Sequence, residues 1–186
     1  MRPSGAWYLT SNPTEQLGSV FDRAVPGFSY SPQDAAVAGV AAHLQTAKTN
    51  PQGTYPTPRP GKTLPGFAPN DPLHRLYEGA GAEQQQRRAA NESVRKAYCN
   101  STEFQSMKPT YPAPGSRGTW DCDEYPFGST FEGAGRPDAT DLYSVQWVDS
   151  DQNQEAGARL QAWYRNDRIL DGDAFFMSVP SAATAS

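Results

Sequence analysis

The chain has 186 residues, of which 37% are hydrophobic and 19% are charged, and its formal net charge is −4. An acidic balance excludes a protein that coats nucleic acid by charge alone, because phosphate contacts need a basic surface. The aromatic content of 11% argues against disorder along the whole chain, because aromatic side chains supply area that can be buried. No apolar run approaches the ~18 residues of a membrane helix, so no span is expected.

Two helices are predicted in the first third of the chain. A short one is expected around Glu15–Ala24, and a second over Asp34–Ala47, where apolar residues recur at helical spacing. Ser31 followed by Pro32 is the start signal for the second helix, since Ser caps a helix and Pro suits its first position. The rest of this region reads as irregular.

A run of prolines marks the predicted domain boundary. Proline recurs so often between Asn50 and Pro72 that no regular element is expected there. Residues 1–70 are therefore interpreted as a Pro-rich, mostly irregular N-terminal extension or adaptor arm. Residues 71–180 are interpreted as the functional domain, and residues 181–186 as a tail.

The domain is predicted to alternate helices, loops and strands. Strong helix formers without proline predict the first helix, and alternating apolar residues predict the first strand. In chain order, we expect a helix over Ala82–Cys99, a loop over Tyr111–Gly118, a strand over Tyr143–Val148, a helix over Asn153–Asn166 and a strand over Phe175–Val179.

The two cysteines, Cys99 and Cys122, cannot make a structural zinc site alone, and no histidine lies near either in the sequence. A disulfide between them would close the polar, Pro-rich loop Asn100–Asp121 and contribute about 3 kcal/mol in the loop-entropy account. The alternative is two free buried thiols. A disulfide favours an oxidising compartment, and because no apolar leader follows Met1, the chain is expected to be either cytoplasmic or the product of a longer precursor.

Four acidic residues cluster in the sequence: Asp121, Asp123, Glu124 and Glu132. Carboxylates this close repel one another unless a cation, a proton or a cationic side chain separates them. A divalent cation held by oxygen ligands is one solution. The other is a hairpin whose acids point to solvent on alternate sides.

Three motifs resemble one family. Cys122–Ala134, which reads CDEYPFGSTFEGA, closely resembles the signature of the NucA/NucB deoxyribonuclease family. Asn153–Gly157 resembles that family's Asn-x-x-x-Gly helix start, and Arg168–Phe176 its C-terminal strand motif. Pro72–Arg75 resembles the lead-in of the actinobacterial branch. The resemblance spans Asp71–Val179 and does not cover the residues before it.

This resemblance implies a small secreted endonuclease that uses a divalent cation, Mg²⁺ or Mn²⁺. It implies an α+β fold with a small ββα-metal (HNH-like) core and flanking helices. The first strand of such cores usually supplies a histidine, whereas this family has an aspartate, which Asp123 matches as the general base. The sequence agrees, since its only histidines, His43 and His74, lie far upstream of the hairpin.

The resemblance also implies ligands. Glu124 is expected either to bind the metal, directly or through water, or to hold a backbone group or an arginine. Glu132 is expected to reach the metal from the second strand. Asn153 stands where this fold class places a metal ligand, Glu155 is a second candidate, and Gln152 stands where some members carry an acid.

Arginines are expected to contact phosphates. Arg159 and Arg168 are the first candidates, with ion pairs to Asp149 or Asp171 as the alternative. A local basic strip would let an acidic protein bind a duplex weakly and in a salt-sensitive way. Its members are Arg87, Arg88, Arg95, Lys96, Arg117, Arg159, Arg165 and Arg168.

The leading interpretation is a metal-dependent DNA endonuclease without sequence preference, which hydrolyses phosphodiester bonds with no covalent intermediate. It would be secreted, or delivered into a target cell as the toxic part of a larger effector. Residues 1–70 would then meet an immunity or inhibitor protein, or a delivery machinery. The alternatives are a broader nuclease of DNA and RNA, and an inactive binding module that keeps the fold.

Overall fold

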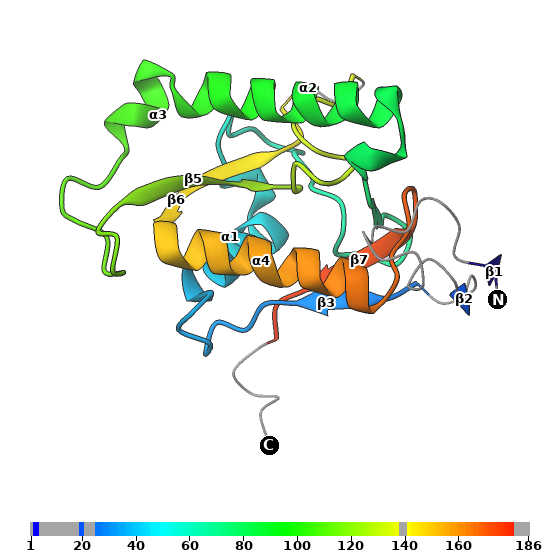
Figure 1. The fold of residues 1–186 in the computed structure, drawn as a ribbon. Coiled ribbons are helices and arrows are strands. Elements are labelled where there is room, and N and C mark those ends of the chain that lie inside the picture. Colours follow the sequence, from blue (N-terminus) through cyan, green and yellow to red (C-terminus); the bar gives the residue numbers. More distant parts are fainter. Residues whose placement is uncertain (1, 4–18, 21–24, 138–140, 181–186) are drawn as a thin grey trace.

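The computed structural model describes residues 2–3, 19–20, 25–137 and 141–180 (Figure 1). Within these residues it is an α+β fold with three small sheets. β1 (Arg2–Pro3) pairs with β2 (Ser19–Val20). In the second sheet, β7 (Ala174–Ser178) lies between β3 (Gly27–Ser29), which is parallel to it, and β4 (Leu73–His74), which is antiparallel. The predicted closing strand is thus confirmed, and it is central in its sheet.

The third sheet is an antiparallel pair formed by β5 (Trp120–Tyr125) and β6 (Ser144–Asp149). Their register places Asp123 opposite Gln146. The helices are α1 (Ala38–Thr49), α2 (Ala82–Cys99), α3 (Thr102–Ser106) and α4 (Ser150–Asn166), with 3₁₀ turns at Pro51–Gly53 and Glu78–Ala80.

α1 begins at Ala38, four residues later than predicted. The preceding segment forms two turns, in which the Asp34 N–H donates to the Ser31 carbonyl and the Val37 N–H donates to the Asp34 carbonyl. The Asp34 carboxylate also accepts the Ala36 N–H at 3.0 Å. An aspartate that binds nearby backbone N–H groups favours a turn over a helix.

The other predicted helices have different outcomes. Ala82–Cys99 is confirmed as α2 with the predicted bounds. α4 begins at Ser150, three residues earlier than predicted, because the Asp149 carboxylate accepts the N–H groups of Asp151 and Gln152. Most of the helix predicted at Glu15–Ala24 lies outside the described residues, and the described part of it, β2, is a strand.

The main hydrophobic core joins the two sides of the predicted domain boundary. Tyr30, Val40 and Leu44 precede residue 70, and they are buried with Leu160 and Phe175. β3 also pairs with β7, near the other end of the chain. A unit of about 110 residues buries a limited fraction of its surface, so the added apolar face of α1 enlarges its core. Residues 27–68 therefore fold with the domain rather than as an arm apart from it.

The Pro-rich stretch is mostly irregular, as predicted, but it is packed against the domain. Thr54, Lys62 and Leu64 are all buried. The Lys62 ammonium donates to the carbonyls of Thr54 at 2.8 Å and Pro56 at 2.6 Å. These bonds hold the loop closed on itself.

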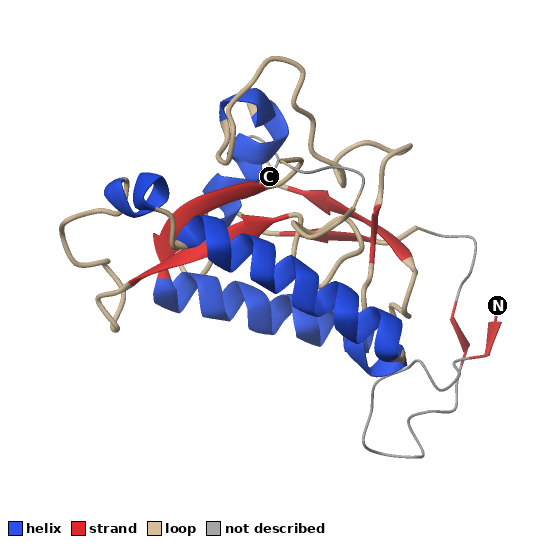
Figure 2. Ribbon diagram, turned by 90° about the horizontal axis from the view of Figure 1, so that it is seen from above, coloured by secondary structure: helices blue, strands red, loops and turns tan. Residues whose placement is uncertain are grey.

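The β5–β6 hairpin lies between α2 on one side and α4 on the other (Figure 1). From above, the two long helices run along the hairpin with roughly parallel axes (Figure 2). The predicted disulfide is confirmed, and it joins Cys99 at the end of α2 to Cys122 in β5. Within the described residues, none of the helices is both long and apolar enough to span a bilayer.

Candidate active site

A cavity of about 520 Å³ opens along β5, between α2 and α4. Among the described residues, β5 pairs only with β6, and its residues Asp121 to Glu124 line the cavity. Charged and polar side chains from all three elements line the cavity: Arg88, Arg95, Asp121, Asp123, Glu124, Asn153 and Gln154. Carboxylates therefore face arginines across a concave surface.

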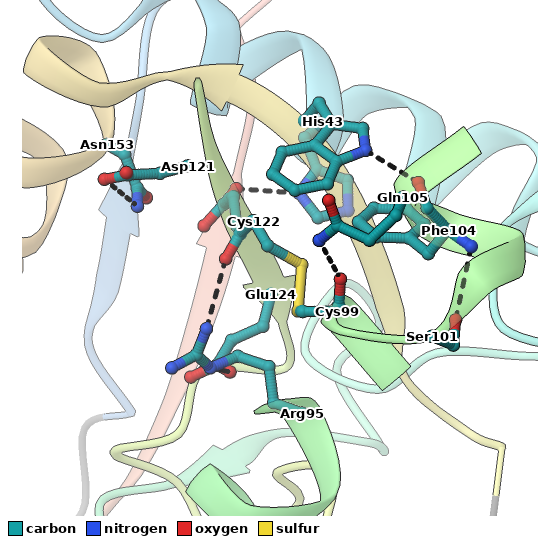
Figure 3. Close-up of a disulfide and its surroundings, with 12 residues drawn as sticks. His43, Arg95, Cys99, Ser101, Phe104, Gln105, Asp121, Cys122, Glu124 and Asn153 are labelled. Atoms are coloured by element: carbon teal, nitrogen blue, oxygen red, sulfur yellow. Dashed lines mark hydrogen bonds and ion pairs between the residues drawn. A yellow bond between two sulfur atoms is a disulfide. The ribbon is translucent and has the colours of Figure 1, made fainter. Parts of the chain in front are cut away.

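Asp121 and Asn153 meet on the α4 side of the cavity. The Asn153 amide donates to an Asp121 carboxylate oxygen at 3.3 Å (Figure 3). Asp121 and Asp123 project from the same side of β5, because successive strand residues alternate. From the sequence, Asp121 was expected only as one member of the acidic cluster, whereas the structure places it directly in the cavity wall.

Asp123 lines the cavity but is only 8% exposed. Its Oδ2 lies 2.7 Å from Nδ1 of His43, which is fully buried in α1. The other ring nitrogen of His43 lies 2.7 Å from the Ser144 hydroxyl in β6. His43 lies far upstream of the hairpin in the sequence, but the fold returns α1 to the hairpin and brings His43 against Asp123, a contact that was not predicted.

Glu124 faces α2, on the other side of β5. Its Oε2 lies 2.5 Å from the Arg95 Nε in an ion pair without hydrogen-bond geometry, and Figure 3 shows Glu124 pointing toward Arg95. Its Oε1 accepts the Gly128 N–H at 2.9 Å. A Cβ at Gly128 would stand 2.5 Å from that Oε1, so a larger residue there would displace the Glu124 carboxylate from its present position. Of the roles considered for Glu124, the structure shows the contacts to a backbone group and to an arginine.

Residues 69–178 match the profile of the family described as Deoxyribonuclease NucA/NucB. The chain belongs to this family. The NucA/NucB enzymes hydrolyse phosphodiester bonds of DNA, so this protein is a hydrolase of that class. No curated protein and no solved structure matches the chain. The NucA/NucB match begins after α1, so His43 lies outside it.

Burial raises the pKa of Glu124 to about 7 from an ordinary 4.5, although Arg95 opposes the shift. Below pH 4.5 this carboxyl is protonated in both the folded and the unfolded chain. Between pH 4.5 and 7 the folded chain keeps the proton that the unfolded chain releases, so stability falls as pH rises.

We therefore expect the wild type to lose on the order of 1–3 kcal/mol of unfolding free energy relative to Glu124→Gln over this pH interval. Urea unfolding at several pH values, in the presence of a chelator, measures this loss of unfolding free energy. Glu92→Gln is the control, since Glu92 is exposed and pairs with Lys96, and both residues lie on α2. Parallel pH curves for wild type and Glu124→Gln would contradict the expectation.

The NucA/NucB signature residue Glu132 lies in a turn after β5, whereas the second strand of the hairpin is β6. Its carboxylate accepts the His74 N–H at 2.8 Å and lies 2.8 Å from the His74 ring. Glu132 does not line the cavity. The following Gly133 packs against Asn91 of α2, so this part of the signature joins loop to helix.

The structure separates the three predicted metal ligands of α4. Asn153 lines the cavity, whereas Gln152 and Glu155 line a separate groove. The Gln152 side chain accepts the Gly39 N–H at 2.6 Å, and Glu155 accepts from Arg159 at 2.7 Å. Among the described residues, no three His, Cys, Asp or Glu side chains are grouped closely enough to hold a metal ion.

The three predicted phosphate-binding arginines do not line the cavity. Arg159 pairs with Asp34 and Glu155, and Arg117 pairs with Asp151 at 3.4 Å. Arg168 lies in the turn after α4 with a positive φ of 54°. Instead, Arg88 and Arg95 of α2 line the cavity, although from the sequence they were expected only as members of the wider basic strip.

Proposed function

We propose that this NucA/NucB protein is a metal-dependent DNA endonuclease without sequence preference, and that the cavity along β5 is its active site. One observation carries the proposal: the carboxylate of Asp123 lines a cavity whose opposite wall holds two arginines of α2. A carboxylate accepts a proton from water, and arginines bind phosphate. Both functions are needed to hydrolyse a phosphodiester.

Asp123 is proposed as the general base. It is nearly buried, it faces the cavity, and His43 of α1 contacts one of its two oxygens. The other oxygen then accepts the proton of the attacking water. Glu124 is already engaged by Arg95 and Gly128, so we propose that it orders the α2 wall.

The cavity residues fit a hydrated Mg²⁺ or Mn²⁺. Asp121, Asp123 and Asn153 supply hard oxygen donors, and such ions keep several waters and need only one or two carboxylates. When bound, the cation would polarise the phosphate and the attacking water. We therefore propose Asp121 and Asn153 as its direct ligands and Asp123 as a contact through the bound water that it deprotonates; Gln152 and Glu155, which line the other groove, are not included.

Arg88 is proposed to contact the phosphate backbone. Its guanidinium lines the cavity, and among the described residues no hydrogen bond or ion pair occupies it. Contacts to phosphate carry no sequence information. This supports cleavage without sequence preference.

For Arg88→Gln we expect kcat/KM on duplex DNA to fall about tenfold, because a charge-assisted contact is lost. We also expect the slope of log(kcat/KM) against log[salt] to become shallower by about one. Arg159→Gln is the matched control, since Asp34 and Glu155 already pair with this arginine. An equal loss in both variants would remove Arg88 from the substrate contact.

We also propose that the protein acts outside the cell that makes it. The NucA/NucB nucleases are secreted, and the Cys99–Cys122 disulfide suits an oxidising compartment. Delivery into a target cell, with an immunity or inhibitor protein meeting residues 1–70, is the narrower form of this proposal. Growth arrest of a host with an oxidising cytoplasm that expresses the chain, absent for Asp123→Asn, would support toxicity inside a cell.

Plasmid nicking tests the proposed activity. We expect the purified protein to convert supercoiled plasmid to nicked and linear forms with Mg²⁺ or Mn²⁺, and to stop when EDTA is added. Restored cleavage after excess Mg²⁺ excludes damage by the chelator. Cleavage that survives EDTA would contradict metal dependence, and RNA cleaved at the same rate would broaden the substrate to nucleic acids in general.

A further inference from the structure

His43 lies behind Asp123, on the side away from the cavity. Nδ1 is 2.7 Å from the Asp123 carboxylate and Nε2 is 2.7 Å from the Ser144 hydroxyl. The ring is fully buried and is not part of the cavity wall. Both ring nitrogens are therefore used within the protein, and neither is available to a substrate.

The hydrogen-bonding partners determine where the ring protons lie. An ionised carboxylate only accepts hydrogen bonds, so Nδ1 carries a proton and donates it to Asp123. In a neutral ring Nε2 then accepts the Ser144 hydroxyl proton. Ser144 thereby fixes the tautomer that faces Asp123.

α1 is held firmly enough to fix this arrangement. Val40, Ala41, Leu44 and Ala47 are all buried on the face of α1 that packs into the core. His43 shares that buried face, at the point where α1 reaches the hairpin. α1 lies outside residues 69–178, so a segment beyond the family match reaches the active site.

We propose that His43 is a positioning residue for DNA cleavage. Its Nδ1–H holds one oxygen of Asp123, so that the other oxygen faces the cavity and accepts the proton of the attacking water. This inference rests on the proposed function, in which Asp123 is the general base. It also assigns α1 a role in the chemistry besides its role in the core.

Two substitutions separate positioning from simple packing. In His43→Asn the amide nitrogen stands where Nδ1 stood, so the donor to Asp123 is kept and the contact to Ser144 is lost. In His43→Gln the amide nitrogen stands near the position of Nε2, so the contact to Ser144 is kept and the donor to Asp123 is lost. Each variant leaves one partner unpaired, and the cost to stability is larger at the charged Asp123 than at the Ser144 hydroxyl, so melting temperatures are measured beside kcat.

We expect His43→Gln to lower kcat on a fluorogenic DNA duplex by about 10- to 100-fold with little change in KM, because a misplaced base acts poorly. His43→Asn is expected to retain most of the wild-type kcat, although it too loses a buried hydrogen bond. In an Asp123→Asn background, His43→Gln is expected to cause no further loss.

Equal losses of kcat in His43→Asn and His43→Gln, tracking their melting temperatures, would overturn the positioning role while leaving the proposed function intact. Asp123→Asn with wild-type activity would instead overturn the proposed function, whatever the His43 variants show. Activity lost in His43→Gln and retained in His43→Asn would establish the role.

Discussion

Asp123→Asn is expected to lower kcat for plasmid cleavage by about 10²- to 10⁴-fold, the usual contribution of a positioned general base. The amide has nearly the same shape as the carboxylate but does not accept a proton from water. Because Asp123 is buried against His43, the substitution also changes the hydrogen bond between them. Initial rates at saturating Mg²⁺, with circular dichroism to verify folding, measure the effect.

Asp151→Asn is the matched control for this prediction. Asp151 lies on α4 but lines the separate groove, where it pairs with Arg117. We expect its kcat to stay close to that of the wild type. Comparable losses in both variants would mean that general acidity of the surface, rather than the carboxylate at position 123, supports cleavage.

Loss of the Cys99–Cys122 disulfide is expected to have the largest effect on stability. The double variant Cys99→Ala/Cys122→Ala should lose about 2–5 kcal/mol of unfolding free energy, as is typical of small disulfide-bonded domains. The bond ties the end of α2 to the middle of β5, and the chain between them carries little regular structure besides α3. Urea unfolding of the double variant, and of the wild type with a reductant, measures the loss.

Cleavage should be impaired in the same variant, because Cys122 lies between Asp121 and Asp123 on β5. We expect the wild type under reducing conditions to lose stability and activity in parallel with the double variant. A loss below about 1 kcal/mol would show that packing of α2 already holds the hairpin.

Local signals in the sequence predicted several elements well. α2 has strong helix formers and no proline, and its bounds were predicted correctly. The starts of α1 and α4 were missed because each depends on an aspartate, Asp34 in a turn and Asp149 as a cap. Whether an aspartate caps a helix or holds a turn depends on the tertiary structure around it, which a local sequence pattern does not specify.

Helical geometry explains why Asn153 and Glu155 separate. Residues two apart on a helix point about 200° apart, so both do not face one cavity. Gly157, four residues after Asn153, shares its side and lines the cavity. The sequence already contained this information once a helix was assigned there, and it would have placed Glu155 on the other face.

His43 and Glu132 were beyond the reach of sequence reasoning. His43 is 80 residues from Asp123, and only the packing of α1 onto the hairpin brings them together. Glu132 reads like a strand residue near the acidic cluster, yet it lies in a turn bonded to His74. Both depend on tertiary contacts that periodicity does not encode.

Locating a bound cation tests the central claim most directly. Crystals of the protein soaked with Mn²⁺ should show an anomalous-scattering peak in the cavity, bordered by Asp121, Asp123 and Asn153. The peak should be absent from crystals of Asp123→Asn soaked in the same way. A peak in the groove beside Asp151 and Glu155 instead, with the β5 cavity empty, would contradict the assignment of the active site.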